Sequence, residues 1–274
     1  MEREDYLDPA CPLCGRPGET ETARPVPMGR VLEKLAALEA ANDREGAGRH
    51  LRYWLAEAEQ IADERAQLSL NNELMGHCRM RGEGEKALAH AARALELVER
   101  LGMEETITAG TTWVNAGTVR EAFGDPEGGL RCFERARENY ERSLPPDDPR
   151  LGGLYNNMGL ALTALARYRE AEDVFRRALS VMARRPGGEP ERAVTLLNLA
   201  DAAEAELGPE AAEPVVAGYL DEAAALLDAD GPERNAAYAF FCEKCAPVFG
   251  YYGYFAKEAE LRERARRIYA GGAT

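Results

Sequence analysis

Four of the six cysteines in this 274-residue chain form two CxxC pairs near its opposite ends. Cys11 and Cys14 lie in CPLCG, which has the cysteine, proline and glycine usage of a zinc-binding knuckle. Cys242 and Cys245 lie in the aromatic stretch FCEKCAPVFGYYGYF. Zinc in structural sites takes four ligands, so one CxxC pair leaves the metal underligated. Both pairs together would complete one four-cysteine zinc site, which is the first hypothesis that the sequence raises.

The expected compartment bears on these thiols. The N-terminal MEREDYLDPACPLC has neither the basic nor the apolar region of a signal peptide. No apolar run approaches the roughly 18 residues that a membrane span needs. We therefore expect a cytoplasmic protein, in which paired cysteines bind metal or act in redox chemistry before they form structural disulfides. Three alternatives stay open: the pairs are unrelated, CPLC joins a second chain, or the second pair forms a reversible disulfide.

Composition limits the partner classes. The formal net charge is −14, and 30% of the residues are charged while only 7% are aromatic. Such an acidic chain repels phosphate backbones and anionic lipids, so neither nucleic acid nor a membrane surface is an expected partner. The abundance of Ala, Leu, Glu and Arg predicts helices.

The helices that position these residues follow a repeat of about forty residues. NNMGLALTALARYREAEDVFRRALSVM, from Asn156 to Met182, has apolar and small residues at helical spacing on two segments joined by a short turn. Related stretches place a reference residue of helix A at Met75, Gly117, Gly159, Ala200 and Pro247, the last by aligning Ala259 with Ala171. A small residue at this position lets the two helices of a hairpin approach closely, and stacking of successive hairpins buries their apolar faces.

These stretches resemble tetratricopeptide repeats, most closely the 42-residue kinesin-light-chain type. The resemblance implies an all-α fold: a right-handed superhelical α-solenoid of stacked helix-turn-helix hairpins with a concave groove. It divides the chain into an N-terminal tail with the CxxC knuckle (1–28), a divergent first hairpin (29–63), central repeat hairpins (64–231) and an atypical aromatic capping repeat (232–274). Members of this family mostly hold peptides or partner proteins in the groove and are rarely catalytic.

Three asparagines, Asn115, Asn157 and Asn198, each precede the reference residue by two positions. They should point into the groove, where an amide can both donate to and accept from a ligand backbone. The resemblance implies that they bind peptide as a ladder. Alternatively, they bridge neighbouring helices within the solenoid.

In the same alignment Cys242 and Cys245 face the groove beside Pro247, which should kink the helix because proline cannot donate to the carbonyl of Glu243. Six hairpins at about 10 Å each give an arc near 50–60 Å. An extended tail from Gly15 to Arg30 reaches roughly 50 Å. The tail could therefore bring its two cysteines to the second pair.

The sequence contains no nucleophile elbow, P-loop or HExxH motif, and its CxxC pairs lack the βαβ context of a thiol-disulfide enzyme. We therefore expect a non-catalytic interaction module that binds an extended peptide or protein segment. The alternative is a sensor in which zinc or thiol oxidation gates the groove.

Overall fold

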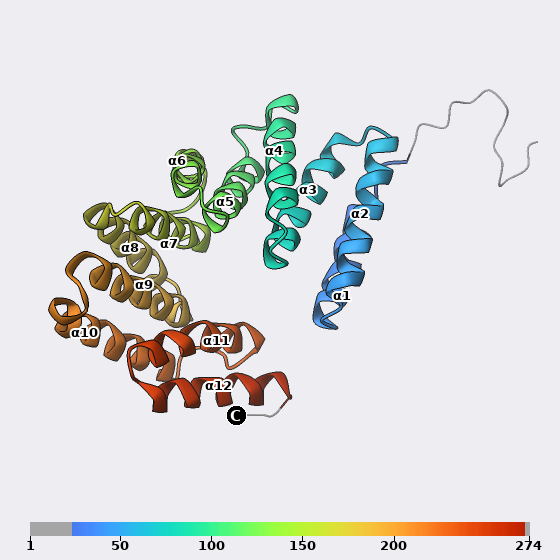
Figure 1. Cartoon of the computed structure of the whole chain (residues 1–274). Coiled ribbons are helices and arrows are strands. Elements are labelled where there is room, and N and C mark those ends of the chain that lie inside the picture. The colour runs from blue at the N-terminus through green and yellow to red at the C-terminus, as the bar shows by residue number, and fades with distance from the viewer. Residues whose placement is uncertain (1–23, 272–274) are drawn as a thin grey trace, which may run out of the picture. The chain divides into compact units, whose positions relative to one another are not determined.

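The computed structural model describes residues 24–271, and all of its regular elements are helices. The helices are α1 (Met28–Ala40), α2 (Arg44–Gln60), α3 (Glu64–Met80), α4 (Gly84–Arg100), α5 (Ile107–Ala122), α6 (Pro126–Ser143), α7 (Pro149–Ala164), α8 (Tyr168–Ala183), α9 (Glu189–Leu207), α10 (Pro209–Asp228), α11 (Ala236–Tyr251) and α12 (Phe255–Tyr269). Figure 1 traces them along the chain. The predicted all-α solenoid is confirmed over this part of the protein.

The chain divides into two compact units between Leu74 and Met75, a point inside α3. In the N-terminal unit, α1 packs against α2 around a core that includes Val31, Leu35 and Leu51. Asp63 fixes the start of α3, because its carboxylate accepts from the backbone N–H groups of Val26 and Ala66 at 3.0 Å each. This unit is a helical hairpin with its own small apolar core.

In the C-terminal unit, α5 packs with α6, α7 with α8, α9 with α10, and α11 with α12, each as an antiparallel hairpin. One hydrophobic core runs without a break through the later hairpins, from Leu130 to Ala265. Because each hairpin leaves an apolar face that only its neighbour covers, stacking is what completes this core.

Side chains at the helix starts explain several of the boundaries. Asp125 accepts from the backbone N–H of Gly128 at 2.8 Å, and Thr106 accepts from Ala109 at 3.2 Å. Asn235 accepts from two N–H groups in the first turn of α11. Each cap satisfies a donor that has no partner within its own helix.

The turn between the two helices of a hairpin carries a residue with positive φ. In five hairpins this residue is Asn42, Gly82, Gly124, Ala166 or Gly253, with φ between 53° and 86°, whereas Gly208 of the α9–α10 turn combines φ of 81° with an extended ψ of 161°. This left-handed conformation favours glycine, since a β-carbon there meets the following carbonyl. The residue therefore marks the same place in each of these hairpins.

Close contact between paired helices depends on glycine facing phenylalanine. A β-carbon at Gly159 of α7 would lie 2.4 Å from Phe175 of α8, and one at Gly117 of α5 would lie 2.5 Å from Phe133 of α6. Neither phenylalanine ring is accessible to solvent. The small residue expected at the reference position thus has the predicted role in both hairpins.

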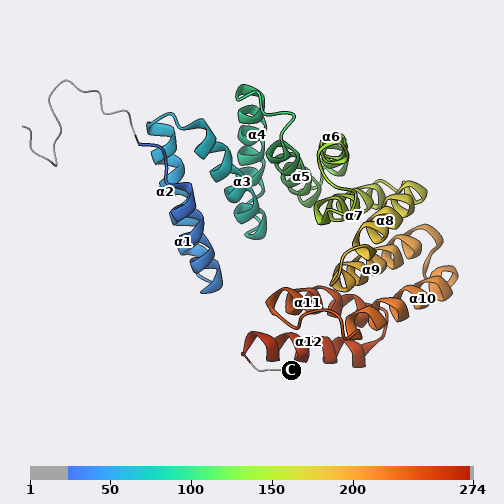
Figure 2. The same cartoon turned by 180° about the vertical axis from the view of Figure 1, so that it is seen from behind.

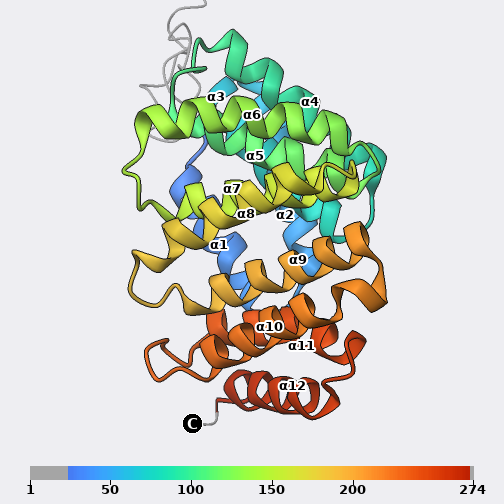
Figure 3. The same ribbon diagram turned by 90° about the vertical axis from the view of Figure 1, so that its left-hand side faces the viewer.

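Within the C-terminal unit, the first helices of the hairpins lie on the inner side of an arc and the second helices on its outer side. Figures 1 and 2 show α5, α7, α9 and α11 along the inner side. Figure 3 views the arc from outside, where α6, α8 and α10 cross in front. The candidate groove is therefore a surface of these four inner helices.

Candidate functional site

Four residues on each inner helix, spaced i, i+4, i+7 and i+11, share one side of that helix, and the hydroxyl of one of them, Thr111, also lies 2.8 Å from that of Tyr140 on the paired helix α6. They are Thr111, Asn115, Thr118 and Ala122 of α5; Gly153, Asn157, Leu160 and Ala164 of α7; Val194, Asn198, Asp201 and Ala205 of α9; and Phe240, Lys244, Pro247 and Tyr251 of α11. None of them is buried. We call this surface the inner face.

The three predicted asparagines occupy one position on consecutive helices of the inner face, and all are half-buried. The Asn198 amide donates to Oδ1 of Asn156 at 2.9 Å, which joins α9 to α7. The Asn157 amide makes a longer contact of 3.5 Å with Oγ1 of Thr118, which joins α7 to α5. Two of the asparagines therefore bridge neighbouring helices, as the alternative interpretation expected. Their role in peptide binding stays a prediction.

Cys242 and Cys245 do not face the groove as expected. Their exposed fractions are 0% and 1%, and both belong to the hydrophobic core of the C-terminal unit. Burial raises the pKa of the Cys242 thiol to about 11 and that of Cys245 to about 12. The surroundings thus favour the protonated thiols, whereas zinc binds the thiolate.

A one-residue error in the alignment of the last repeat explains this correction. Gly253 occupies the left-handed turn position that Ala166 occupies in α7–α8, an offset of 253 − 166 = 87 residues. The same offset pairs Ala246, not Pro247, with Gly159. The alignment made from the sequence used an offset of 88 residues. It matched Ala259 to Ala171, which is buried, but Ala259 is exposed.

With the corrected offset, Cys242 matches Tyr155 and Cys245 matches Met158, which are both core positions. Pro247 moves to the exposed inner face, and α11 runs as one helix from Ala236 to Tyr251 through it. The helix therefore does not open at the proline as predicted.

The other two proposed zinc ligands, Cys11 and Cys14, lie outside the described residues. Within the described part of the chain, no three side chains of His, Cys, Asp or Glu gather as a metal site. The four-cysteine zinc site therefore stays a prediction.

A cleft of 560 Å³ lies between α9 and α11 on the inner side of the arc. It is lined by Asp201, Glu204, Ala205, Pro247, Val248 and Tyr251. Its residues come from the first helices of two consecutive hairpins, and it combines two carboxylates with apolar and aromatic surface. The sequence alignment missed it because the one-residue error placed Val248 and Tyr252, in place of Pro247 and Tyr251, on the exposed face.

The family model for the tetratricopeptide repeat matches residues 108–184 and again residues 150–215. Residues 108–215 are tetratricopeptide repeats. The resemblance inferred from the 42-residue step is thereby confirmed, and α5 to α9 contribute these tetratricopeptide-repeat helices. No curated protein matches the chain in sequence.

Two solved structures share the tetratricopeptide-repeat fold with this chain. Kinesin light chain TPR-like repeats from Podosopora anserina superpose with a TM-score of 0.53 and 16% identity, over 74% of this chain and 95% of that one. A Rap protein complexed with Competence and Sporulation Factor superposes with a TM-score of 0.58 and 15% identity, over 88% of this chain and 63% of that one. At these identities the likeness concerns the fold alone.

Tetratricopeptide repeats generally serve as protein–protein interaction modules.

Among residues 24–271, no helix combines the length and the apolar character needed to cross a lipid bilayer.

Proposed function

We propose that this protein is a non-catalytic cytoplasmic module that binds an extended segment of a partner protein along its inner face. The observation that carries the proposal is the repetition, on α5, α7, α9 and α11, of four exposed or half-buried residues at one spacing. A helix face that only served stacking would be fully buried by its neighbours. A regular face that stays partly accessible instead offers contacts several times along one direction.

The spacing of the asparagines suits an extended backbone. Neighbouring helices pack about 8–10 Å apart, and an extended chain rises about 3.3 Å per residue. One helix-to-helix step along the inner face thus corresponds to about three residues of bound segment. An asparagine at each step could bond to the backbone of every third residue, whatever the side chains there.

The amide bridges are compatible with this role. The Asn198 amide uses a hydrogen of its Nδ2 group on Asn156, while its Oδ1 atom has two acceptor positions. The bridge holds the side chain in one orientation, which reduces the conformational entropy that binding would otherwise remove. The Rap protein, which has the same fold, was solved in complex with a partner, the Competence and Sporulation Factor.

A blocking substitution tests the proposal. Gly153 lies on the inner face four residues before Asn157, and a β-carbon there would meet no atom within 4 Å. Gly153→Trp should therefore fill the groove without disturbing the fold. Ser180→Trp, at an exposed position of the outer helix α8, is the matched control.

The full chain is immobilised, and binders are selected from a phage library of random dodecapeptides. We expect peptides that bind the parent and the Ser180→Trp variant equally and the Gly153→Trp variant at least about tenfold more weakly. A selection without any specific binder, or with binders indifferent to Gly153→Trp, would contradict binding on the inner face.

A further inference from the structure

The α11 end of the inner face is the most exposed apolar part of this surface. Phe240 and Tyr251 are 48% and 72% exposed, and the exposed Pro247 lies between them on the same side of the helix. The cleft against α9 begins at Pro247 and Tyr251. A partner segment lying on the inner face would contact this helix side directly.

The hydroxyl group of Tyr252 lies within hydrogen-bond distance of two carboxylates, those of Asp201 and Glu204. The Tyr252 hydroxyl lies 3.0 Å from Oδ1 of Asp201 and 2.9 Å from Oε2 of Glu204. A phenol has one hydrogen to donate, so it can satisfy only one of these acceptors at a time. The Tyr251 hydroxyl makes a longer contact of 3.4 Å with Glu204. Within the described part of the chain these two hydroxyls are the side-chain donors to the pair, so acceptor positions of both carboxylates stay open to solvent or to a ligand.

Among residues 24–271, neither Asp201 nor Glu204 forms an ion pair with Lys, Arg or His. Desolvation raises the pKa of Asp201, the charge of Glu204 raises it further, and the hydrogen bond from Tyr252 opposes the rise. The only basic residue of the inner face, Lys244, lies two helical turns from Tyr251 and over the ring of Phe240.

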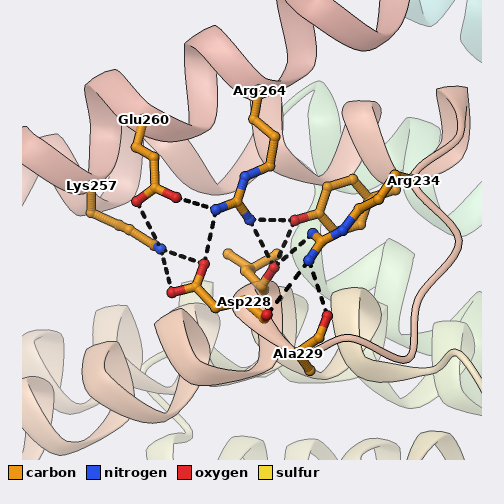
Figure 4. Close-up of polar contacts among 8 residues, drawn as sticks. Asp228, Ala229, Arg234, Lys257, Glu260 and Arg264 are labelled. Carbon is orange, nitrogen blue, oxygen red and sulfur yellow. Dashed lines mark hydrogen bonds and ion pairs between the residues drawn. The ribbon is translucent and has the colours of Figure 1, made fainter. Parts of the chain in front are cut away.

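Another carboxylate of the same unit, that of Asp228, has its negative charge compensated by cations of the protein. Asp228 accepts from Lys257 at 2.7 Å and from Arg264 at 3.0 Å, and both cations also contact Glu260 (Figure 4). The protein thus neutralises Asp228 from within. It leaves the negative charge of Asp201 and Glu204 open toward the inner face.

We propose that the cleft between α9 and α11 binds an arginine or lysine side chain of the partner segment. This inference rests on the proposed function and adds the charge of the partner. The aliphatic part of the side chain would lie along Pro247 and Val248. Its cation would lie at the ring of Tyr251 and bond to Asp201 and Glu204, where charge-assisted hydrogen bonds supply the missing donors.

Arginine should bind better than lysine. Its planar guanidinium can stack on the tyrosine ring and still direct several N–H groups toward two carboxylates. A lysine ammonium offers three donors from a single point and is more strongly hydrated. The expected partner is therefore an extended segment with one arginine in a fixed place relative to its contacts with the asparagines.

The peptide selection tests this inference separately from the proposed function. We expect binders of the parent chain to share an arginine or lysine at one fixed position. The variant Asp201→Asn with Glu204→Gln should bind those peptides about tenfold more weakly and select new peptides without that preference. Because the whole chain is acidic, the control Glu138→Gln with Asp173→Asn removes the same charge from exposed positions of the outer helices α6 and α8. It should leave both binding and selection unchanged.

Tyr251 supplies an independent measurement. Tyr251→Phe keeps the ring and should retain most of the affinity for a selected peptide, whereas Tyr251→Ala should lose about fivefold or more. Replacing the shared arginine of the peptide by citrulline, which is neutral, should abolish the difference between the parent and the Asp201→Asn, Glu204→Gln variant.

The outcomes separate the two proposals. Groove binders without a basic preference would overturn the cationic site and leave the proposed function standing. A selection without binders would overturn both. If the control variant and the Asp201→Asn, Glu204→Gln variant bound the peptides equally weakly, the effect would come from net charge alone, and the cationic site would be overturned. A dimer that the Asp201→Asn, Glu204→Gln variant dissociates, seen by sedimentation, would assign the face to a second copy and also overturn it.

Discussion

The ring of Phe175 lies so close to Gly159 that a β-carbon on the glycine would be 2.4 Å from its Cε1 atom. The phenylalanine belongs to α8 and is fully buried, so it cannot move aside without opening the core. The separation of α7 and α8 is thus set by the absence of a single methyl group.

Gly159→Ala should destabilise the protein by about 1–3 kcal/mol, the usual range for overpacking a filled core. Gly153→Ala in the same helix is the control. It meets no atom within 4 Å and should stabilise by about 0.5–1 kcal/mol through helix propensity. Urea unfolding measures both. A double variant with Phe175→Leu should recover part of the loss, and a Gly159→Ala protein as stable as the parent would contradict the packing described here.

Ala166→Gly should stabilise the protein by about 0.5–1 kcal/mol. Ala166 has φ of 55° in a turn where other hairpins carry Gly82, Gly124 and Gly253. An alanine in this conformation is strained, and the relief should exceed the added freedom of the unfolded chain. Ala164→Gly, two residues earlier at the last position of α7, should instead destabilise the protein, because glycine is a poor helix former. Equal shifts of the two unfolding midpoints would contradict the assignment of the turn.

Asn198→Ala should lower the free energy of unfolding by about 0.5–1.5 kcal/mol, because it removes the 2.9 Å bond to Asn156. Asn157→Ala should lower it less, since the contact of Asn157 with Thr118 is long. Asn198→Asp should be worse than Asn198→Ala, because it places a carboxylate beside an acceptor oxygen. The order of the three midpoints in urea is the measurement, and the reverse order would contradict the bridge.

The two buried thiols should make stability fall at alkaline pH. Below about pH 8.5, where free cysteine titrates, both thiols are protonated in the folded and in the unfolded protein. Above it the unfolded chain releases them, while the folded protein retains them up to pKa values of about 11 for Cys242 and about 12 for Cys245. The unfolded state is therefore favoured by at most about 1.4 kcal/mol per pH unit for each thiol.

Unfolding free energies of the parent and of a Cys242→Ala, Cys245→Ala variant, measured from pH 8 to 10.5, test this. The free energy of unfolding should fall more steeply with pH in the parent than in the variant. The tyrosines are the same in both proteins, so they do not contribute to this difference. Identical slopes would show that the two thiols are not desolvated.

The zinc hypothesis predicts one metal ion per chain, bound by Cys11, Cys14, Cys242 and Cys245, in protein purified without chelator. Cys11→Ser with Cys14→Ser should release it. Elemental analysis and a count of reactive thiols measure both. Metal-free protein in which only the two N-terminal thiols and Cys132 react would contradict the site, because Cys132 is half-buried while Cys242 and Cys245 are buried.

The repeat architecture was predictable because stacking leaves a local trace in sequence: small residues such as Gly117 and Gly159 recur where paired helices touch. The register of the last hairpin was mistaken because alanine is common on both exposed and buried helix faces, so Ala259 was a poor anchor. Gly253 was the better one, since its left-handed turn restricts residue choice. The charged cleft was missed because the same error moved Pro247 and Tyr251 off the exposed face, and because Asp201 and Tyr251 meet only through the packing of two helices.

The last carbonyl groups of α10 are capped from outside their own helix. The Leu227 carbonyl accepts from Arg234 at 2.9 Å, from the Tyr238 hydroxyl at 2.6 Å and from Arg264 at 2.9 Å (Figure 4). During synthesis, Arg264 follows Asp228 by 264 − 228 = 36 residues. At about 5–20 residues per second, α10 waits roughly 2–7 s for its complete cap. Until α12 has been synthesised, the C-terminal end of α10 therefore lacks the bond from Arg264 and is incompletely capped in the nascent chain.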